Sequence, residues 1–220
     1  MKGVNNMSQK VLVLGAAGQV ATLLTQRLLT ETDASLVLYG RNVSERINIT
    51  NPDREVTIDG DFNDIATLTK ALKDVDIVYL NSMSSVPNTQ NIINVLKANH
   101  VKRIIGVTIV GIYNEFSKQL GDWTKHNLSS SYQIAEQQSA ALLENSGLDY
   151  TLLRLTWLYN DPNNTNYQLI PHGTTVTQAQ VTRQAVAKAI VDVINHEQDY
   201  RNQSLAVVEP NTDYDKPSFY

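Results

Sequence analysis

The sequence predicts a single α/β domain in which helices cover both faces of a doubly wound parallel sheet. Two observations carry this prediction. Short apolar runs of strand type alternate with amphipathic helical stretches along the chain, and a glycine-rich turn directly follows the first run. Strands that are apolar on both faces and separated by helices are typical of parallel sheets buried on both sides. The predicted fold is therefore Rossmann-like, with ligands at the carboxyl ends of the strands.

Seven apolar runs predict the strands. Most are rich in Val, Ile and Leu over five or six residues, as a buried strand requires. The third run is the weakest because polar residues interrupt it. In chain order the runs are KVLVL at 10–14, SLVLY at 35–39, EVTID at 55–59, DIVYL at 76–80, RIIGVT at 103–108, YTLLRL at 150–155 and SLAVV at 204–208.

Five stretches with helical spacing lie between these strands. Pro87 falls in the first turn of one of them, where proline is tolerated. Gly147 follows the fourth stretch and is a candidate C-cap. Segments 109–129 and 160–174 lack this periodicity and are expected to be loops; the second is rich in Asn, Pro and Gly. The predicted helices span residues 19–29, 64–73, 86–99, 130–145 and 181–195.

The composition excludes several kinds of site. Cysteine is absent, which removes disulfides, thiolate catalysis and Cys-based zinc or iron–sulfur sites. The four histidines are scattered without a spacing typical of metal ligands, so no metal site is expected. The net charge of −4, without a long run of either sign, predicts neither a nucleic-acid partner nor an anionic membrane surface.

The chain is expected to fold as one domain over residues 10–220, with a small C-terminal extension on the substrate side. Residues 1–9 are interpreted as a leader for which disorder is one option. They contain no apolar run typical of a signal peptide, and no stretch approaches the roughly 18 apolar residues of a spanning helix. A cytoplasmic protein is the expectation, and its oligomeric state stays open.

The strongest local signal is the segment VLVLGAAGQVA, in which Gly15, Gly18 and Ala21 have the spacing GxxGxxA. It joins the first strand to the first helix, the context in which such glycines bind phosphate. Gly15 permits a tight turn, and Gly18 lets backbone N–H groups approach a pyrophosphate at the start of the helix. A tight turn that binds nothing is the alternative. We expect a dinucleotide to bind at Gly15, Ala17, Gly18, Gln19 and Val20.

The end of the second strand indicates which dinucleotide binds. An acidic residue there would hold the adenine ribose hydroxyls and favour NAD. This strand ends in LYGRN, without a carboxylate. Arg41 can instead pair bidentately with a 2′-phosphate, although a solvated turn arginine is the alternative. NADP is therefore expected, and NAD is the less favoured cofactor.

Further motifs accompany the glycine turn. They are Asp59-Gly60-Asp61 followed by Asp64, DIV at 76–78, RIIGVT at 103–108, SGLDYTLLR at 146–154 and VTR at 181–183. With these segments the chain, from about residue 10 to about residue 194, resembles the atypical short-chain dehydrogenase/reductase family, in particular its NAD(P)H-binding, NmrA-like branch. The resemblance implies an NAD(P) cofactor and oxidoreductase chemistry on a small-molecule substrate.

The resemblance also implies cofactor contacts for single residues. Asp61 and Phe62 would lie beside the adenine. Asn81 and Ser82, which follow the fourth strand, would line the ribose or the nicotinamide. A purely structural alternative exists for Asp59 and Asp61, because Asp before a helix commonly caps it.

Two catalytic residues follow from the same resemblance. Thr108 occupies the position of a serine that polarises a substrate carbonyl, although a threonine there could simply end the strand by bonding to backbone. Tyr132 occupies the position of the tyrosine that exchanges a proton. In the family this tyrosine belongs to a YxxxK motif, but here Glu136 replaces the lysine. A tyrosine has a pKa of about 10, which a cation would lower and a carboxylate raises, so the usual mechanism is disfavoured.

Aromatic residues are expected to build the substrate pocket. Tyr113, Phe116, Trp123 and His126 lie in the segment after the fifth strand, and Trp157 and Tyr159 follow the sixth. Long loops at this position commonly form a pocket or a lid. The aromatic content would suit a flat, conjugated ligand. The C-terminal segment DYDKPSFY could pack on the surface, contact another chain or stay mobile.

Three functions fit these observations. The first is an NADP-dependent oxidoreductase that transfers hydride to a small conjugated acceptor such as a flavin, quinone or carbonyl. The second is a non-catalytic regulatory protein that senses NADP(H), which the loss of the lysine favours. A sugar-nucleotide epimerase or dehydratase is the third, and it ranks low because few residues follow the sixth strand to build a substrate lobe.

Overall fold

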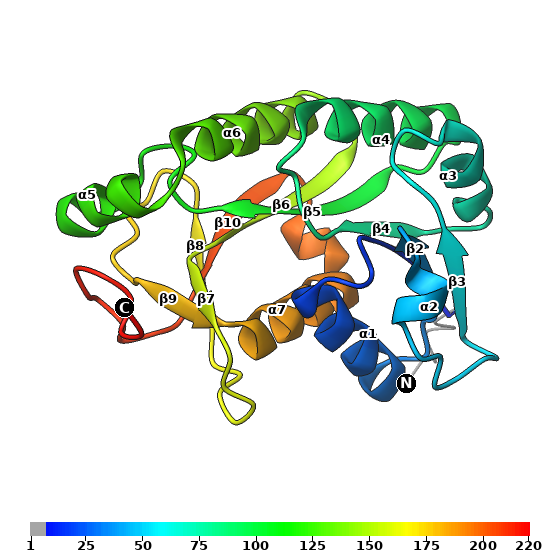
Figure 1. Ribbon diagram of the computed structural model, residues 1–220, viewed down its shortest axis with the longest axis horizontal. Helices are drawn as coiled ribbons and strands as arrows, with labels where there is room; N and C mark the ends of the chain where they lie inside the picture. The colour runs from blue at the N-terminus through cyan, green and yellow to red at the C-terminus, as the bar shows by residue number, and fades with distance from the viewer. Residues whose placement is uncertain (1–7) are drawn as a thin grey trace.

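A central eight-stranded sheet runs through the molecule (Figure 1). The computed structural model describes residues 8–220, so most of the expected leader, residues 1–7, lies outside the described residues. The strand order is β3-β2-β1-β4-β5-β6-β10-β8, and every neighbouring pair is parallel except β10 with β8. The strands are β1 (Lys10–Leu14), β2 (Ser35–Gly40), β3 (Glu55–Asp59), β4 (Ile77–Leu80), β5 (Arg103–Ile109), β6 (Asp149–Leu155), β8 (Gln168–Pro171) and β10 (Gln203–Val208).

Helices lie on both faces of the sheet. Figure 1 shows α1 and α7 on one face and α3, α4 and α6 on the other. Short strands β7 (Trp157–Tyr159) and β9 (Gln180–Thr182) pair in a separate two-stranded sheet. The α-helices are α1 (Gln19–Glu31), α2 (Val43–Arg46), α3 (Ile65–Ala71), α4 (Val86–Ala98), α5 (Lys118–Asn127), α6 (Ser130–Glu144) and α7 (Arg183–Asn195).

The register of β1 brings the expected cofactor residues together. Leu14 pairs with Tyr39 of β2 on one side and with Leu80 of β4 on the other. The residues that follow these three therefore lie at one edge of the sheet. The winding direction also changes between β1 and β4, and in doubly wound sheets the ligand crevice opens at this switch. The predicted α/β, Rossmann-like class is confirmed.

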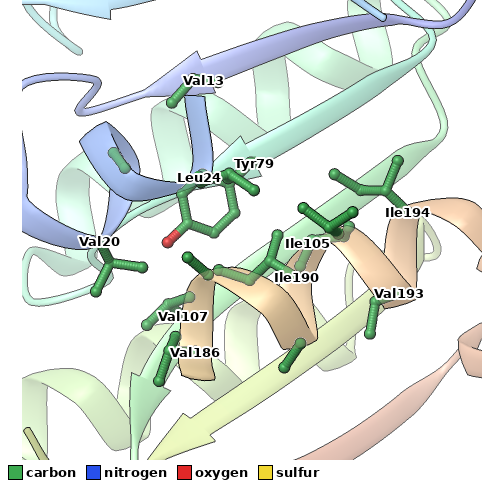
Figure 2. Packing of buried hydrophobic residues seen from close by; sticks show 14 of the residues in the cluster. Val13, Val20, Leu24, Tyr79, Ile105, Val107, Val186, Ile190, Val193 and Ile194 are labelled. Carbon is green, nitrogen blue, oxygen red and sulfur yellow. The ribbon is translucent and has the colours of Figure 1, made fainter. Parts of the chain in front are cut away.

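The core consists of one apolar layer on each side of the sheet. On the α1–α7 side, Val20 and Leu24 of α1 and Val186 and Ile190 of α7 belong to one buried cluster with Ile105 of β5 (Figure 2). All five side chains are buried. Truncating one such side chain to alanine typically costs about 2–5 kcal/mol of stability. This layer holds the start of α1, and with it the glycine turn, against the strand ends.

Both segments predicted to be loops contain regular structure. Segment 109–129 includes helix α5, whose buried residues are only Leu120 and Thr124, so its apolar periodicity is weak in the sequence. Segment 160–174 includes β8, an edge strand that ends in Pro171 and pairs antiparallel with β10. Proline is tolerated at such an edge. The sequence reasoning missed both because short, partly polar elements depend on tertiary contacts.

The last helix starts two residues later than predicted. Its N-cap is Thr182, whose hydroxyl accepts a hydrogen bond from the Ala185 N–H at 3.0 Å. Gln180–Thr182 instead form β9. Throughout residues 8–220, no helix is long and apolar enough to cross a membrane.

Candidate functional site

The glycine turn is tied to the end of β2. Gly15 has a φ of +81°, a left-handed conformation that glycine adopts without strain. This conformation lets the N–H groups of Gly15 and Ala16 both donate to the Tyr39 carbonyl, at 2.9 and 3.1 Å. The conformation of the turn therefore depends on hydrogen bonds to the neighbouring strand β2 as well as on its own residues.

Gly18 is the N-cap of α1 and leaves the start of the helix open. No side chain caps the helix, and its first turn contains no acidic residue. The first backbone N–H groups of a helix lack intrahelical partners and attract anions. A Cβ at position 18 would lie 2.3 Å from Nδ2 of Asn81, the residue that follows β4, so any larger residue here requires the Asn81 side chain to shift. Asn81 in turn accepts a hydrogen bond from the Tyr79 hydroxyl at 2.9 Å.

A first cavity of about 300 Å³ lies against this turn and carries positive charge. Two of the residues that line it are arginines, Arg41 and Arg46, and one is acidic, Asp61. The sequence reasoning missed Arg46, although its position in the segment that follows β2 was a usable signal. The lining residues are Gly15, Ala17, Gly18, Gly40, Arg41, Val43, Arg46, Gly60, Asp61, Phe62 and Asn88.

The aspartates after β3 have three different local roles. Asp64 is the N-cap of α3 and accepts from the Thr67 N–H at 3.0 Å. The capping alternative for Asp59 and Asp61 is therefore wrong. Asp59 accepts from the backbone and hydroxyl of Ser44 in α2. Hydrogen bonds from Asn63, and secondarily the nearby Arg41, lower the pKa of Asp61, so its carboxyl is ionised at the rim of the cavity.

Phe62 packs beside Tyr39 with a ring-centroid distance of 6.1 Å and an interplanar angle of 17°. The Tyr39 hydroxyl donates to the Asp61 carbonyl at 2.8 Å. Burial is the main cause that raises the pKa of Tyr39 to about 12, so this hydroxyl stays protonated. Tyr39 is fully buried, so of the two rings only Phe62 lines the basic cavity, and Tyr39 supports it from behind.

A second cavity, of about 370 Å³, lies at the carboxyl ends of β4, β5 and β6. The larger part of its lining surface is apolar, and polar side chains, among them Thr108, Glu136 and Arg183, contribute the rest. The predicted residues Gln19, Val20, Asn81, Ser82, Thr108 and Tyr132 all line it. The other lining residues are Val107, Ile109, Val110, Phe116, Thr124, Leu128, Glu136, Leu155, Thr156, Trp157, Leu158 and Arg183. The predicted site residues thus divide between two cavities that lie next to each other, because Gly18 of the first is a neighbour of Asn81 of the second.

The polar group of the second cavity centres on Glu136. The Thr108 hydroxyl donates to a carboxyl oxygen of Glu136 at 2.9 Å, so Thr108 does not end its strand by bonding to backbone. Glu136 is 1% exposed and Thr108 is 2% exposed. Burial raises the pKa of Glu136, while the hydrogen bond from Thr108 and the neighbouring hydroxyl of Tyr132 lower it. Burial raises the pKa of Tyr132, and the neighbouring Glu136 raises it further.

The aromatic wall differs from the expectation. Phe116 and Trp157 line the second cavity, but Tyr113, Trp123, His126 and Tyr159 do not. Tyr113 faces the buried Arg154, with the guanidinium 5.2 Å from its ring centroid. His126 lies in α5, where its ring contacts the Asp122 carbonyl.

The C-terminal segment packs on the outside of this wall. The ring centroid of Tyr220 is 5.1 Å from that of Trp123 and 5.5 Å from that of Trp157. The Ser218 N–H also donates to Gln180 of β9 at 2.8 Å. Of the three options for this segment, the structure shows packing on the surface.

Comparison with known proteins identifies the family. The family model described as NAD(P)H-binding matches residues 15–197. Two structures of a short-chain dehydrogenase/reductase from Veillonella parvula DSM 2008 are 42% identical in sequence, with a TM-score of 0.94. Each alignment covers 97% of this chain and 100% of the other, and one structure is a complex with NADP.

More distant structures share the fold. A Rossmann-fold NAD(P)-binding family protein from Shigella flexneri is 27% identical, with a TM-score of 0.80, and the alignment covers 97% of this chain and all of the other. ChuY, an anaerobillin reductase from Escherichia coli O157:H7, is 19% identical over 96% of this chain and all of its own, with a TM-score of 0.72. At that identity the likeness shows the fold alone. No curated protein matches the chain.

The family match, the strand order and the glycine turn agree with one another. The resemblance noted in the sequence is confirmed by a model that spans most of the chain. The chain belongs to the NAD(P)H-binding family of atypical short-chain dehydrogenases/reductases.

Proposed function

We propose that the protein is an NADP-dependent reductase that acts on a small conjugated acceptor bound in the second cavity. The observation that carries this proposal is the pair of neighbouring cavities, one basic and one mainly apolar, on either side of Gly18 and Asn81. The basic cavity suits the phosphates of the cofactor. The apolar one suits a flat ring system. When bound, the cofactor supplies the hydride, and the protein's own groups position the reactants and exclude water.

The preference for NADP rests on the end of β2. The end of this strand, LYGRN, has no carboxylate, and Arg41 and Arg46 both line the cavity there. Arg46 lies against the Arg41 carbonyl, which keeps the two guanidinium-bearing residues side by side. Two arginines suit a 2′-phosphate because each can form charge-assisted hydrogen bonds to its oxygens. The similar Veillonella protein, which was crystallised with NADP, supports the same choice.

The cofactor proposal is tested by titration with NADPH and NADH, followed by nicotinamide fluorescence. We expect NADPH to bind at least tenfold more tightly than NADH. Arg41→Ala and Arg46→Ala should each weaken NADPH binding about 10- to 100-fold, as expected for hydrogen bonds to a charged group, and leave NADH binding nearly unchanged. Arg201→Ala is the matched control, because Arg201 pairs with Asp149 and Glu197 away from both cavities. Equal affinity for the two nucleotides would contradict the proposal.

The acceptor class rests on the lining of the second cavity. Phe116 and Trp157 provide aromatic surface, and Val107, Val110 and Leu155 provide aliphatic surface. Ligand sites of this size are typically apolar with a few placed polar groups, here Thr108 and Glu136. Single-turnover reduction of menadione, FMN and 9,10-phenanthrenequinone tests the proposal. Oxidation of bound NADPH by at least one of them is the expected result.

A sensor of NADP(H) is the second candidate, and Glu136 is the observation that favours it. The residue occupies the place of the lysine that would lower the tyrosine pKa, and it raises the pKa of Tyr132 instead. A sensor would bind NADPH and NADP⁺ with clearly different affinities and oxidise no acceptor. The same titrations, repeated with NADP⁺, separate the two candidates.

A further inference from the structure

Glu136 is a buried acid in the cavity that we assign to the acceptor. It lies one helical turn beyond Tyr132 on α6, so the two side chains share a face of the helix. Both line the second cavity together with Thr108. Tyr132 is the exposed member of this group, at 37%, whereas Glu136 is 1% exposed. The tyrosine therefore stands between the acid and the open part of the cavity.

No cation within the described part of the chain compensates the carboxyl. Among residues 8–220, Glu136 forms no ion pair. Its polar neighbours are Thr108 of β5 and Tyr132 of α6, and both are neutral hydroxyls. Arg183, which also lines the cavity, donates to Asn160 at 3.2 Å instead. A buried carboxyl without a cation favours its protonated form.

We propose that Glu136, in its neutral form, is the proton source of the reaction and that the Tyr132 hydroxyl passes this proton to the acceptor. The proposal rests on the reductase function proposed above. It assigns to Glu136 a task different from that of the missing lysine. A lysine would lower the pKa of the tyrosine and help it to lose its proton. A neutral acid instead donates a proton to the tyrosine oxygen while the tyrosine donates its own proton to the acceptor.

The step is balanced in atoms and charge. The acceptor gains a hydride from the cofactor, as the reductase function already requires. The Tyr132 O–H bond breaks, and its proton forms a bond to the heteroatom of the acceptor. The Glu136 O–H bond breaks at the same time, and its proton restores the Tyr132 hydroxyl. Glu136 is left as a carboxylate, which accepts a hydrogen bond from Thr108 and takes up one solvent proton after the product leaves, so each turnover consumes one proton from the solvent.

This relay removes the difficulty that arises because Glu136, and not a lysine, lies beside Tyr132. A tyrosinate next to a carboxylate in a buried site would be strongly disfavoured. In the relay Tyr132 never carries a charge, because it receives one proton while it donates the other. The negative charge appears only on Glu136, where Thr108 stabilises it.

The test compares single-turnover reduction of menadione by NADPH-loaded protein across a pH series. We expect Glu136→Gln and Tyr132→Phe each to slow the reaction about 100-fold, within the usual range for general acid catalysis. Because the two groups act in series, the double variant should be no slower than either single one. The parent rate should fall as pH rises through the pKa of Glu136, and Glu136→Gln should lose this dependence.

Control variants separate the role of Glu136 from a structural effect. Glu144→Gln, two helical turns further along α6, lies outside the cavity and should leave the rate and its pH dependence unchanged. Glu136→Asp should retain part of the rate. A Glu136→Gln protein with the parent rate and pH profile would overturn the relay. Bound NADPH that reduces none of the three acceptors would instead overturn the reductase function, and the relay with it.

A readout without turnover examines the acid itself. In infrared spectra at neutral pH, the parent protein should show the carbonyl band of a protonated carboxylic acid, and Glu136→Gln should lack it. Glu144→Gln should retain the band. If the parent and Glu136→Gln spectra coincide in this region, Glu136 is ionised and cannot be the proton source.

Discussion

Arg154 of β6 and Glu115, in the segment between β5 and α5, form a buried ion pair with an N–O distance of 2.5 Å. Arg154 is fully buried and also donates to the carbonyls of Ile170 and Ser204. The pair therefore connects β6 with β8, β10 and the segment that leads to Phe116 at the acceptor cavity. The arginine of the family-like segment SGLDYTLLR thus has a structural position, outside both cavities.

Removal of Glu115 should destabilise the fold strongly. Glu115→Ala leaves the Arg154 guanidinium buried without its partner, and breaking such a pair typically costs about 3–5 kcal/mol. Chemical denaturation monitors the change in the free energy of unfolding. The exposed pairs of Arg201 provide the control, since Arg201→Ala should cost less than about 1 kcal/mol. A loss of similar size in both variants would show that the buried pair has no special role.

The hydrogen bond from Thr108 should set the pH dependence of the reaction. This bond lowers the pKa of Glu136, so Thr108→Val should raise that pKa further and shift the fall in rate to higher pH. Thr108→Ser keeps a hydroxyl and should retain the parent profile. The pH series of single-turnover rates described above provides the measurement. A shift to lower pH in Thr108→Val would contradict the assigned direction of the bond.

Because Glu136 is buried, we expect it to make the free energy of unfolding depend on pH. Its folded-state pKa is raised, so the folded chain holds this proton more tightly than the unfolded chain does. The stability associated with this group is present below the unfolded-state pKa, which is about 4.3. It is lost as pH rises from there to the folded-state pKa. Each tenfold difference in proton affinity between the two states corresponds to about 1.4 kcal/mol. Glu136→Gln removes the effect.

The melting temperatures of the parent and Glu136→Gln proteins between pH 4 and pH 8 check this point. The variant should gain stability relative to the parent as the pH rises. A constant difference across the range would mean that Glu136 titrates alike in the folded and unfolded states.

Gly18→Ala should weaken NADPH binding at least tenfold. The added Cβ would lie 2.3 Å from the Asn81 side chain, so Asn81 must move at the junction of the two cavities. Fluorescence titration with NADPH measures the loss. Gly121→Ala, in the interior of α5, is the control: its Cβ has an ordinary contact of 3.4 Å, and alanine favours a helix by about 1 kcal/mol. Unchanged affinity in Gly18→Ala would show that the turn tolerates a side chain.

The C-terminal packing can be followed by tryptophan fluorescence. The chain has two tryptophans, and Tyr220 contacts both. Removal of Phe219 and Tyr220 should expose Trp123 and Trp157 to water and shift their emission to longer wavelength. Tyr214→Ala, an exposed residue of the same segment, should leave the emission unchanged. An unaltered spectrum after truncation would mean that the segment does not cover the aromatic wall in solution.

Fold class, the positions of seven strands and the location of the glycine turn could all be predicted from the sequence. Each depends on residues that are close in the chain: apolar periodicity within a strand, or the spacing of Gly15, Gly18 and Ala21 at one strand-to-helix junction. The absence of a carboxylate after β2 was local too. Such features can be predicted because they depend only on the spacing of apolar residues and glycines within one short segment. The roles of the individual site residues stay predictions that the experiments above test.

The way in which distant segments meet could be learned only from the folded chain. Thr108 and Glu136 are 28 residues apart, and only the packing of α6 against β5 brings the hydroxyl to the carboxyl. Tyr220 reaches Trp123 and Trp157 from a distant part of the chain, so the sequence left that segment open. Helix α5 and strand β8 likewise depend on neighbours for much of their stability. Long-range contacts of this kind arise from burial and shape complementarity, which no local pattern of residues records.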